Sequence, residues 1–401
     1  MNVVFLTLFP IDDIDWKNIY TDLMRKFRSE GHQVYIVSPY ERRLGLPTSY
    51  EKKGSVHFLH VKTLNIQKAN IIEKGVGTAI LESQYKRAIS KYLGHIRFDL
   101  ILYSTPPITL SGVVHYLQKK NPQAVSYLLL KDIFPQNAVD IGLFGKNSLF
   151  YWYFRKKEKE LYKLSDYIGC MSPANVEYIR KHNTYYPADH VEVAPNSIEI
   201  TNGLLSKDEI LSVRQKNGLP LDKPVFIYGG NLGKPQGIDY LIQCLDIVQG
   251  RSDCFFLIVG NGTEYHKIQE WCGLHPNANV KLMEGLPQQD YDLLVRSCDI
   301  GLIFLDHRFT IPNFPSRLLA YLENKMPVLC ATDVYTDIGK IAEQNGFGYW
   351  CESKKVEDFT ALVDKILVSD MSRMGEKGYQ YLQEHYLSEH AYQVIVQHLQ
   401  S

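Results

Sequence analysis

The sequence predicts an α/β protein built from two doubly wound halves, and two observations support this prediction. Strand-like apolar runs alternate with amphipathic helical stretches along the chain, as in 2–9, 16–32 and 33–39. The alternation is interrupted at 199–222, which is polar and irregular. Continuous apolar strands separated by helices are typical of parallel sheets covered on both faces. We therefore expect two such sheets, joined near 199–222.

The strands of both halves are predicted from short apolar runs that end in glycine, proline or polar residues. In the first half these runs are 2–9, 33–39, 98–104, 125–132, 166–172 and 191–200, with helices such as 16–32 and 109–120 between them. In the second half they are 224–230, 254–262, 280–285, 299–306 and 327–333, with helices at 237–250, 265–273 and 287–298 and another that opens at Ser316. Ligands bind outside the carboxyl ends of parallel strands, so the loops that leave these ends are the candidate sites.

Composition excludes several classes of protein. The 401 residues carry 44 basic and 44 acidic side chains, and this zero balance argues against a general nucleic-acid binder. The cysteines are odd in number and widely spaced, which favours buried free thiols in a reducing compartment. His57 and His60 alternate along a predicted strand, and no cluster has metal-ligand spacing. The first apolar run is too short for a signal peptide or a membrane span, so we expect a cytoplasmic protein.

Two strand-to-helix junctions of the second half are candidate anion sites. The loop 229–237, GGNLGKPQG, has glycines that permit close backbone approach to an anion, and Lys234 adds a cation. In 309–328 two prolines break the chain, and Ser316 and Arg317 then open a helix whose free N–H groups can hold an anion. Together these elements indicate a diphosphate, as in a nucleotide-sugar. The alternatives are a purely structural turn and a helix cap with a solvated arginine.

The loops of the first half offer polar side chains suited to a second substrate. Asp132 directly follows a strand, where its carboxylate can point into a cleft; the alternative is a capping or turn aspartate. The acceptor-side candidates on these loops are Trp16, Asn18, Thr105, Pro106, Gln136 and Asn137. Amides of this kind can bind sugar hydroxyls or satisfy the loop backbone.

The stretch 148–163 joins five consecutive aromatic residues, 150–154, to Arg155, Lys156 and Lys157. Aromatic anchors beside a basic cluster suit a membrane interface, so the segment 148–157 is a candidate for peripheral contact with the inner face of the cytoplasmic membrane. The alternative is a core helix with a solvated basic end.

These motifs together resemble the retaining glycosyltransferases of family four. The resemblance rests on the Gly-rich turn after the first strand of the second half, the Pro-Ser-Arg helix start, and the segments DYIGCMSPANVEYI and VEVAPNSIE. The stretches YSTPPIT and LLLKDIFPQNAVDIG look like those of bacterial enzymes that build capsule, O-antigen or exopolysaccharide repeat units on a polyprenyl diphosphate carrier. The resemblance covers nearly the whole chain.

The resemblance implies a GT-B fold, with two Rossmann-like domains facing across a cleft. It places an acceptor-binding domain at 1–198, a donor-binding domain at 199–376, and a helical tail at 377–401 that returns to the first domain. The implied activity moves a sugar from a UDP- or GDP-sugar to a lipid-linked or glycan acceptor, with retention and without a metal or other cofactor.

The implied site residues fall into two groups. Asp132, Arg317 and Lys234 are the catalytic candidates, with Asp132 orienting groups near the reacting sugar and the cations stabilising the leaving diphosphate. The implied donor-binding residues, at the diphosphate, the nucleobase and the ribose, are Gly230, Asn231, Gly233, Gln236, Gly260, Asn261, Gly285, Leu286, Ser316 and Glu323.

The chain departs from the family pattern at two places. Asn231 and Gln236 stand where the family has a basic pair, and Pro312 and Ala320 stand where it has two glutamates. Glu323 lies about 60° round the helix from Ala320, so we expect it to replace the ribose contact. These losses keep open a degenerate, non-catalytic subunit, and a nucleotide-sugar 2-epimerase is a further alternative, although it requires an acid/base cluster that the sequence does not show.

Overall fold

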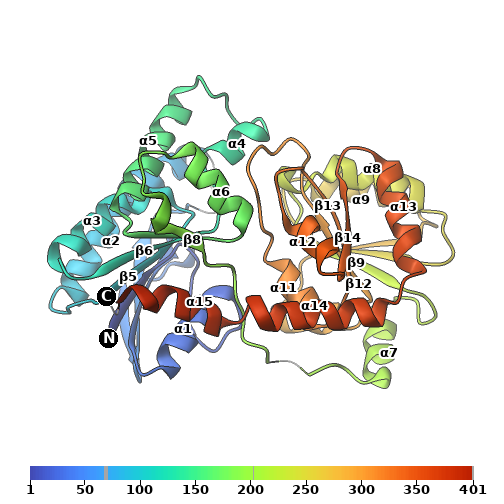
Figure 1. Cartoon of the computed structure of the whole chain (residues 1–401), viewed down its shortest axis with the longest axis horizontal. Coiled ribbons are helices and arrows are strands. Elements are labelled where there is room, and N and C mark those ends of the chain that lie inside the picture. The colour runs from blue at the N-terminus through green and yellow to red at the C-terminus, as the bar shows by residue number, and fades with distance from the viewer. Residues whose placement is uncertain (67–70, 202, 400–401) are drawn as a thin grey trace. The chain divides into compact units, whose positions relative to one another are not determined.

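The structure, a computed structural model, describes residues 1–66, 71–201 and 203–399 and divides into two compact units (Figure 1). Unit 1 comprises Met1–Glu199 and Leu387–Ser401, and unit 2 comprises Ile200–Tyr386. The chain therefore passes from one unit to the other after Glu199 and again after Tyr386. Of the expected tail 377–401, the part up to Tyr386 belongs to unit 2, and residues 400–401 lie outside the described part.

Unit 1 is built on a sheet with the strand order β3-β4-β2-β1-β5-β6-β7-β8, in which neighbouring strands are parallel except for the antiparallel pair β3 and β4. The apolar runs predicted as strands form this sheet because their side chains are buried almost throughout. Its strands are β1 (Asn2–Leu6), β2 (Gln33–Glu41), β3 (Ser49–Lys53), β4 (Val56–Thr63), β5 (Leu100–Ser104), β6 (Val125–Leu130), β7 (Tyr167–Cys170) and β8 (Val191–Val193).

The helices of unit 1 cover this sheet and include one from the far end of the chain. They are α1 (Ile19–Ser29), α2 (Ile71–Leu93), α3 (Ser111–Lys120), α4 (Gln136–Asp140), α5 (Leu149–Leu164), α6 (Pro173–His182) and α15 (Ser388–Val396). The ring of Tyr392 on α15 lies edge-on to Phe27 of α1, with centroids 4.9 Å apart, and its hydroxyl hydrogen-bonds His32 at 2.8 Å. Ile395 and Val396 join the same apolar core, so α15 is part of this unit's fold.

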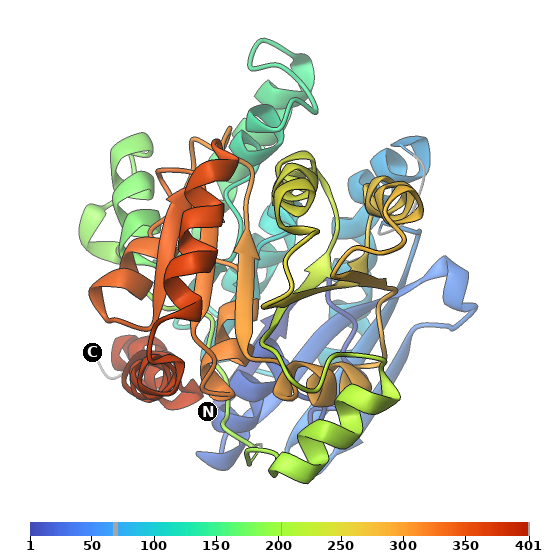
Figure 2. The ribbon, with the colours of Figure 1, turned by 90° about the vertical axis from the view of Figure 1, so that its right-hand side faces the viewer.

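The segment from α4 to the first turns of α5 projects from the rest of unit 1. It is the teal part of the ribbon, and it stands out in both views (Figure 1, Figure 2). Farther along α5, Leu161 and Tyr162 are fully buried and anchor the helix to the unit.

Unit 2 is built on a parallel sheet with the strand order β11-β10-β9-β12-β13-β14. Its strands are β9 (Val225–Asn231), β10 (Phe255–Asn261), β11 (Val280–Met283), β12 (Ile300–Phe304), β13 (Val328–Thr332) and β14 (Gly348–Glu352). Its helices are α7 (Lys207–Lys216), α8 (Ile238–Val248), α9 (Tyr265–Leu274), α10 (Gln288–Arg296), α11 (Arg317–Glu323), α12 (Ile338–Gln344), α13 (Val356–Leu367) and α14 (Met371–His385).

Across both units, short 3₁₀ helices occur at Arg42–Leu44, Ile108–Leu110, Ala188–His190, Lys234–Gln236 and Gln397–Leu399.

The connecting stretch 199–222 was expected to be irregular, and in this the prediction was wrong. It contains the helix α7, which begins at a capping box in which Ser206 accepts from the backbone of Glu209 and the Glu209 carboxylate accepts in return. Arg214 of this helix is buried and donates to Asp299 at 2.5 Å. The helix is therefore fixed to unit 2 by a polar contact rather than by an apolar face.

The other global expectations can be compared directly with the structure. The cysteines are free thiols, and all of them except Cys272 are buried. Within the described ranges, the helices are too short or too polar to cross a membrane.

Candidate active site

The strand order of unit 2 gathers the predicted donor loops at one edge of its sheet. The order changes direction between β9 and β12, which are neighbours although far apart in sequence. The loop 229–237 leaves the carboxyl end of β9, and the Pro-Ser-Arg segment follows β12. The segments 260–264 and 284–288 follow β10 and β11. In open parallel sheets this switch point is where ligands bind.

Glycines let the two loops beside β9 approach each other closely. A Cβ atom on Gly260 would lie 1.8 Å from the carbonyl oxygen of Gly230, and one on Gly262 would lie 2.1 Å from that of Leu232. The Leu232 N–H donates to the carbonyl of Asn261 at 3.0 Å. Gly260 and Gly262 are thus required for backbone-to-backbone packing of the loops that line the switch point.

Arg317 and Gly230 are brought together at this edge. The Arg317 guanidinium lies over the ring of Tyr228, 4.2 Å from its centroid. A Cβ atom on Gly230, whose φ is +133°, would lie 3.1 Å from the Nη2 atom of Arg317. The cation therefore lies directly beside backbone that only glycine leaves open.

One nitrogen of the Arg317 guanidinium, Nη1, is buried and donates no hydrogen bond within the described residues. Nη1 of Arg317 is covered, and none of the described residues accepts a hydrogen bond from it. No described carboxylate forms an ion pair with this side chain either. An unsatisfied buried donor costs about 1–3 kcal/mol, so such a group in a native protein points to a missing anionic or water partner.

A second tyrosine, Tyr291, contacts the backbone at Gly229, next to Gly230. A Cβ atom on Gly229 would lie 1.8 Å from the hydroxyl oxygen of Tyr291. Burial raises the pKa of Tyr291 to about 12, against the lowering effect of Arg317, so the hydroxyl is neutral. The Tyr228 hydroxyl donates to the carbonyl of Asn231 at 2.8 Å and so holds the start of the Gly-rich loop. Sequence reasoning missed both tyrosines; Tyr228 directly before paired glycines was the available signal.

The remaining residues of the Gly-rich loop that were predicted to bind the nucleotide-sugar form hydrogen bonds with one another. The Asn231 side chain donates to the side-chain oxygen Oε1 of Gln236 at 3.0 Å, and the Gly233 N–H donates to the same atom at 3.3 Å. Asn231 and Gln236 therefore stabilise the turn. Lys234 is exposed at its tip.

Other residues predicted to bind the nucleotide-sugar also lie at this edge of the unit 2 sheet, which we call the donor edge. Their hydrogen bonds differ. Ser316 is exposed and precedes α11, but its hydroxyl caps none of the helix N–H groups. The Gly285 N–H donates to the side chain of Asn261 at 3.3 Å, which links the loops after β10 and β11. Leu286 is half-buried beside them.

Glu323 does not reach this edge. It is the last residue of α11, whereas Arg317 is the first, so about 9 Å of helix axis separates them. Its carboxylate is buried and accepts from the Thr201 N–H at 3.2 Å. The expectation that Glu323 replaces the ribose contact is therefore corrected: it binds the segment that enters unit 2.

In unit 1, Thr105, Asp132 and Asn137 come together at the carboxyl ends of β5 and β6. The Thr105 hydroxyl accepts from the Lys131 N–H at 3.0 Å, and the Asn137 amide donates to an oxygen of Asp132 at 2.7 Å. Burial raises the pKa of Asp132 to about 6, although the bond from Asn137 lowers it. A carboxylate that titrates near neutrality is typical of sites that orient or exchange protons.

Two further residues with shifted pKa values were missed: Lys131, the sequence neighbour of Asp132, and Tyr20, which the charge of Asp132 affects. Burial lowers the pKa of the Lys131 ammonium to about 7. Burial also raises the pKa of Tyr20 on α1, and the charge of Asp132 adds to this effect. Lys131 directly precedes Asp132, so adjacency was its signal; Tyr20 is 112 positions away and gave none.

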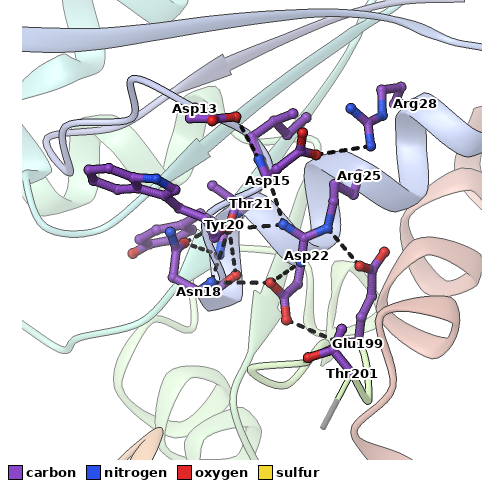
Figure 3. Close-up of polar contacts among 12 residues, drawn as sticks. Asp13, Asp15, Asn18, Tyr20, Thr21, Asp22, Arg25, Arg28, Glu199 and Thr201 are labelled. Atoms are coloured by element: carbon purple, nitrogen blue, oxygen red, sulfur yellow. Dashed lines mark hydrogen bonds and ion pairs between the residues drawn. The ribbon is translucent and has the colours of Figure 1, made fainter. Parts of the chain in front are cut away.

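The other acceptor-side candidates lie around this centre in different roles. Trp16 is exposed, and Asn18 caps α1 by accepting from the N–H groups of Tyr20 and Thr21 (Figure 3). Pro106 is exposed between two cis peptide bonds. Gln136 donates to Asp140 at 2.7 Å along α4.

A polar network next to Asn18 fixes the exit of the chain from unit 1. Asp22, fully buried, accepts from the Glu199 N–H at 2.9 Å, and Arg25 donates to the Glu199 carboxylate at 2.7 Å (Figure 3). Asp22 also accepts from Arg25 at 2.5 Å. This network is structural. Across residues 1–66, 71–201 and 203–399, no group of three histidine, cysteine or acidic side chains could hold a metal ion.

Comparison with known families and sequences gives consistent matches. Residues 210–381 match the family described as "Glycosyl transferases group 1". The "Probable glycosyltransferase WbjE" of Pseudomonas aeruginosa is 23% identical over 304 residues, covering 72% of this chain and 71% of the relative. The "Putative colanic acid biosynthesis glycosyl transferase WcaI" of Escherichia coli K12 is 25% identical over 186 residues, 45% of each chain.

Solved structures match the fold over almost the whole chain. The sucrose-phosphate synthase of Thermosynechococcus elongatus has a TM-score of 0.77 at 14% identity and covers 99% of this chain and 98% of its own. HepE of Anabaena, solved with UDP-glucose, has a TM-score of 0.70 at 13% identity and covers 100% and 99%. WaaG, from lipopolysaccharide biosynthesis, has a TM-score of 0.66 at 14% identity and covers 98% and 99%. These likenesses confirm the GT-B class of two Rossmann-like α/β units.

Proposed function

We propose that this chain, a glycosyltransferase by its group 1 domain at 210–381 and by its named relatives, moves a sugar from a UDP- or GDP-sugar to a polyprenyl-diphosphate-linked or glycan acceptor in bacterial surface polysaccharide synthesis. The observation that carries the donor class is the buried, unpartnered Nη1 of Arg317 beside Gly230. The colanic acid name of one relative and the UDP-glucose held by a structural neighbour support the substrate classes.

In the proposed mechanism, unit 2 holds the diphosphate of the donor. Negative charge builds on this diphosphate as the sugar leaves, and the fixed guanidinium of Arg317 stabilises it without reorganisation. Lys234 and the Ser316 hydroxyl add contacts at the same edge of the sheet. The proposal includes retention of the anomeric configuration and no metal cofactor.

In unit 1, we propose that Asp132 orients the acceptor. Its carboxylate is held by Asn137 at 2.7 Å, and its pKa of about 6 leaves it mostly ionised at neutral pH. Such a group can accept a hydrogen bond from a sugar hydroxyl and needs no covalent intermediate.

A nucleotide panel tests the donor site directly. At a concentration of 100 times its dissociation constant, a bound nucleotide adds about 2.7 kcal/mol to the free energy of unfolding, so UDP or GDP should raise the melting temperature measurably. Arg317→Ala should lose this shift, whereas Arg373→Ala, an exposed arginine on α14, should keep it. If none of the nucleotides stabilises the wild-type protein, the donor-site proposal is wrong.

One observation favours a second candidate, a non-catalytic subunit that still binds a nucleotide. Asn231 and Gln236 bond to each other where the family has a basic pair, so part of the usual positive charge is missing. Transfer or hydrolysis of at least one UDP- or GDP-sugar with a polyprenyl-diphosphate-linked acceptor would exclude this candidate. Nucleotide binding without turnover across the panel would favour it.

A further inference from the structure

The segment from α4 to α5 projects from unit 1 (Figure 1, Figure 2). Large apolar side chains are exposed along it. Monomeric proteins rarely expose contiguous apolar side chains without a partner. The members of this α5 patch, with the exposed fraction of each, are Leu143 (60%), Leu149 (87%), Phe150 (65%), Trp152 (63%) and Tyr153 (47%).

Apart from Leu143, which precedes the helix, the members of the patch occupy one face of α5, and the opposite face fixes the helix to unit 1. Residues 149, 150, 152 and 153 are neighbours on one side of the helix because of its 3.6-residue period. On the other side the ring of Phe154 packs on Phe134, with centroids 4.9 Å apart, and Glu158 is buried with Tyr162. The core-helix alternative is therefore wrong for the start of α5, where Phe150, Trp152 and Tyr153 are exposed. The helix is anchored by Leu161 and Tyr162 of its later turns.

Positive charge surrounds the patch. Residues 141–157 contain Lys146, Arg155, Lys156 and Lys157 and no acidic residue, a local charge of +4 in a chain whose net charge is zero. Arg155 and Lys157 pair with Glu158 and Glu160. Lys146 and Lys156 are exposed and form no ion pair with a described residue. Along the helix the outward face thus changes from apolar to basic.

We propose that the α5 patch docks on an anionic lipid bilayer. The eight residues from Leu149 to Lys156 form about two helical turns, and the apolar face of a helix that lies in the interface enters the headgroup boundary by about 5–10 Å. With this face inserted, Lys146 and Lys156 flank it on either side along the chain, and their ammonium groups can reach the anionic headgroups.

A second copy of the chain fits this surface poorly. Symmetric dimers place the same surface of both copies together, so two unpaired lysine sets would face each other. The bilayer inference stands on this surface alone and does not depend on the proposed sugar transfer.

Vesicle flotation of the full chain tests the inference without any nucleotide-sugar. The wild-type protein should float with mixed phosphatidylcholine–phosphatidylglycerol vesicles and bind pure phosphatidylcholine vesicles less. Leu149→Ser with Trp152→Ser should reduce binding about tenfold or more, since two exposed apolar anchors are lost. The matched control is Leu274→Ser with Val368→Ser, which removes side chains of unit 2 that are 78% and 87% exposed, and it should bind as the wild type does.

Charge reversal gives an independent readout that requires no loss of apolar surface. Lys146→Glu with Lys156→Glu should abolish the preference for phosphatidylglycerol, and added salt should weaken wild-type binding. The inference fails if the wild-type protein does not float with anionic vesicles, or if the serine pair binds them unchanged. It also fails if the serine pair instead abolishes a concentration-dependent dimer in light scattering, because the patch would then cover a second copy.

Discussion

Arg317 lies on the face of Tyr228, and this position determines what can replace it. Stacking on an aromatic ring uses the flat, delocalised guanidinium, which an ammonium group cannot reproduce. The unused Nη1 atom is aimed by the same stacking, so the tyrosine positions the donor as well as packing against it. Function and packing are therefore coupled at this residue.

Arg317→Ala should lower kcat/KM for the donor by about tenfold or more, because a fixed charge that stabilises the leaving diphosphate is lost. Arg317→Lys should recover little of this loss, since a lysine cannot both stack on Tyr228 and present a planar donor. Steady-state kinetics with donor varied give the measurement, and Arg373→Ala is the control. Unchanged kinetics in Arg317→Ala would show that the side chain is only a packing element.

Asp132 should give the enzyme an acid limb. Its pKa of about 6 lies above the ordinary value because the carboxyl is buried, so kcat/KM should rise with pH through about 6. Asp132→Asn, which keeps an acceptor for the Asn137 amide, should flatten this limb. Lys131, with a pKa of about 7, titrates in a neighbouring pH range, so Lys131→Met separates its contribution. A limb that persists in Asp132→Asn would assign it to another group.

The same pKa has a consequence for stability that runs in the opposite direction. The folded protein holds the Asp132 proton at pH values where the unfolded chain has lost it, so stability falls as pH rises from about 4 through about 6. Asp132→Asn should therefore equal the wild type near pH 4 and exceed it near pH 8, by on the order of 2 kcal/mol. Urea unfolding of both proteins at the two pH values measures this difference.

At the residue scale, the sequence predicted positions better than contacts. Arg317 and Asp132 could be selected because each directly follows a strand or opens a helix. Tyr228 and Tyr20 could not, because their roles depend on a ring face or on burial shared with residues distant in sequence. Glu323 was misjudged for a related reason: closeness in angle around a helix ignores the distance along its axis, and the carboxylate binds Thr201 instead.

At the element scale, the loops after β9 and β10 depend on each other. The backbone of one occupies the place that a side chain on the other would need, so neither loop keeps its shape without the other. The Asn231–Gln236 and Asn261–Gly285 bonds extend this dependence to the neighbouring turns. The donor edge is therefore a single set of mutually supporting turns.

Gly260→Ala should disturb this set of turns. Its methyl group would lie 1.8 Å from the Gly230 carbonyl oxygen, which forces the loops apart, so we expect a loss of about 1–3 kcal/mol together with weaker nucleotide binding. The control is Gly273→Ala on α9, where nothing lies within 4 Å and helix propensity favours alanine by about 1 kcal/mol. Thermal unfolding with and without nucleotide distinguishes the two, and equal behaviour would contradict the packing argument.

Elements with an apolar period were predictable, and elements held by polar contacts were not. Most strands of both units and helices such as α9 and α10 follow apolar runs in the sequence, whereas the mostly exposed β3 has no apolar run and was not predicted. α7 was overlooked because it has no apolar stripe; its Ser-x-x-Glu capping box was the only local signal. For α5, the sequence left two orientations open, because an aromatic run reads the same whether it faces the core or solvent.

At the scale of the whole molecule, the alternation of strands and helices was sufficient to predict two doubly wound units, and the solved structures of similar fold confirm the GT-B class. The points of passage between the units were harder to place. Glu199 is held by Asp22 and Arg25, and the second passage at Leu387 pairs with Ile198, so both depend on contacts between distant segments. No local sequence pattern predicts contacts between segments so far apart in the chain.

The return of α15 to unit 1 has a consequence for synthesis on the ribosome. Unit 2 is continuous in sequence and can fold as soon as residues 200–386 have emerged. Unit 1 must wait for Tyr392, Ile395 and Val396 to fill the core beside Phe27. Until then the apolar side chains of α1 that α15 covers in the folded unit stay exposed. The half of the protein that is translated first is thus completed second.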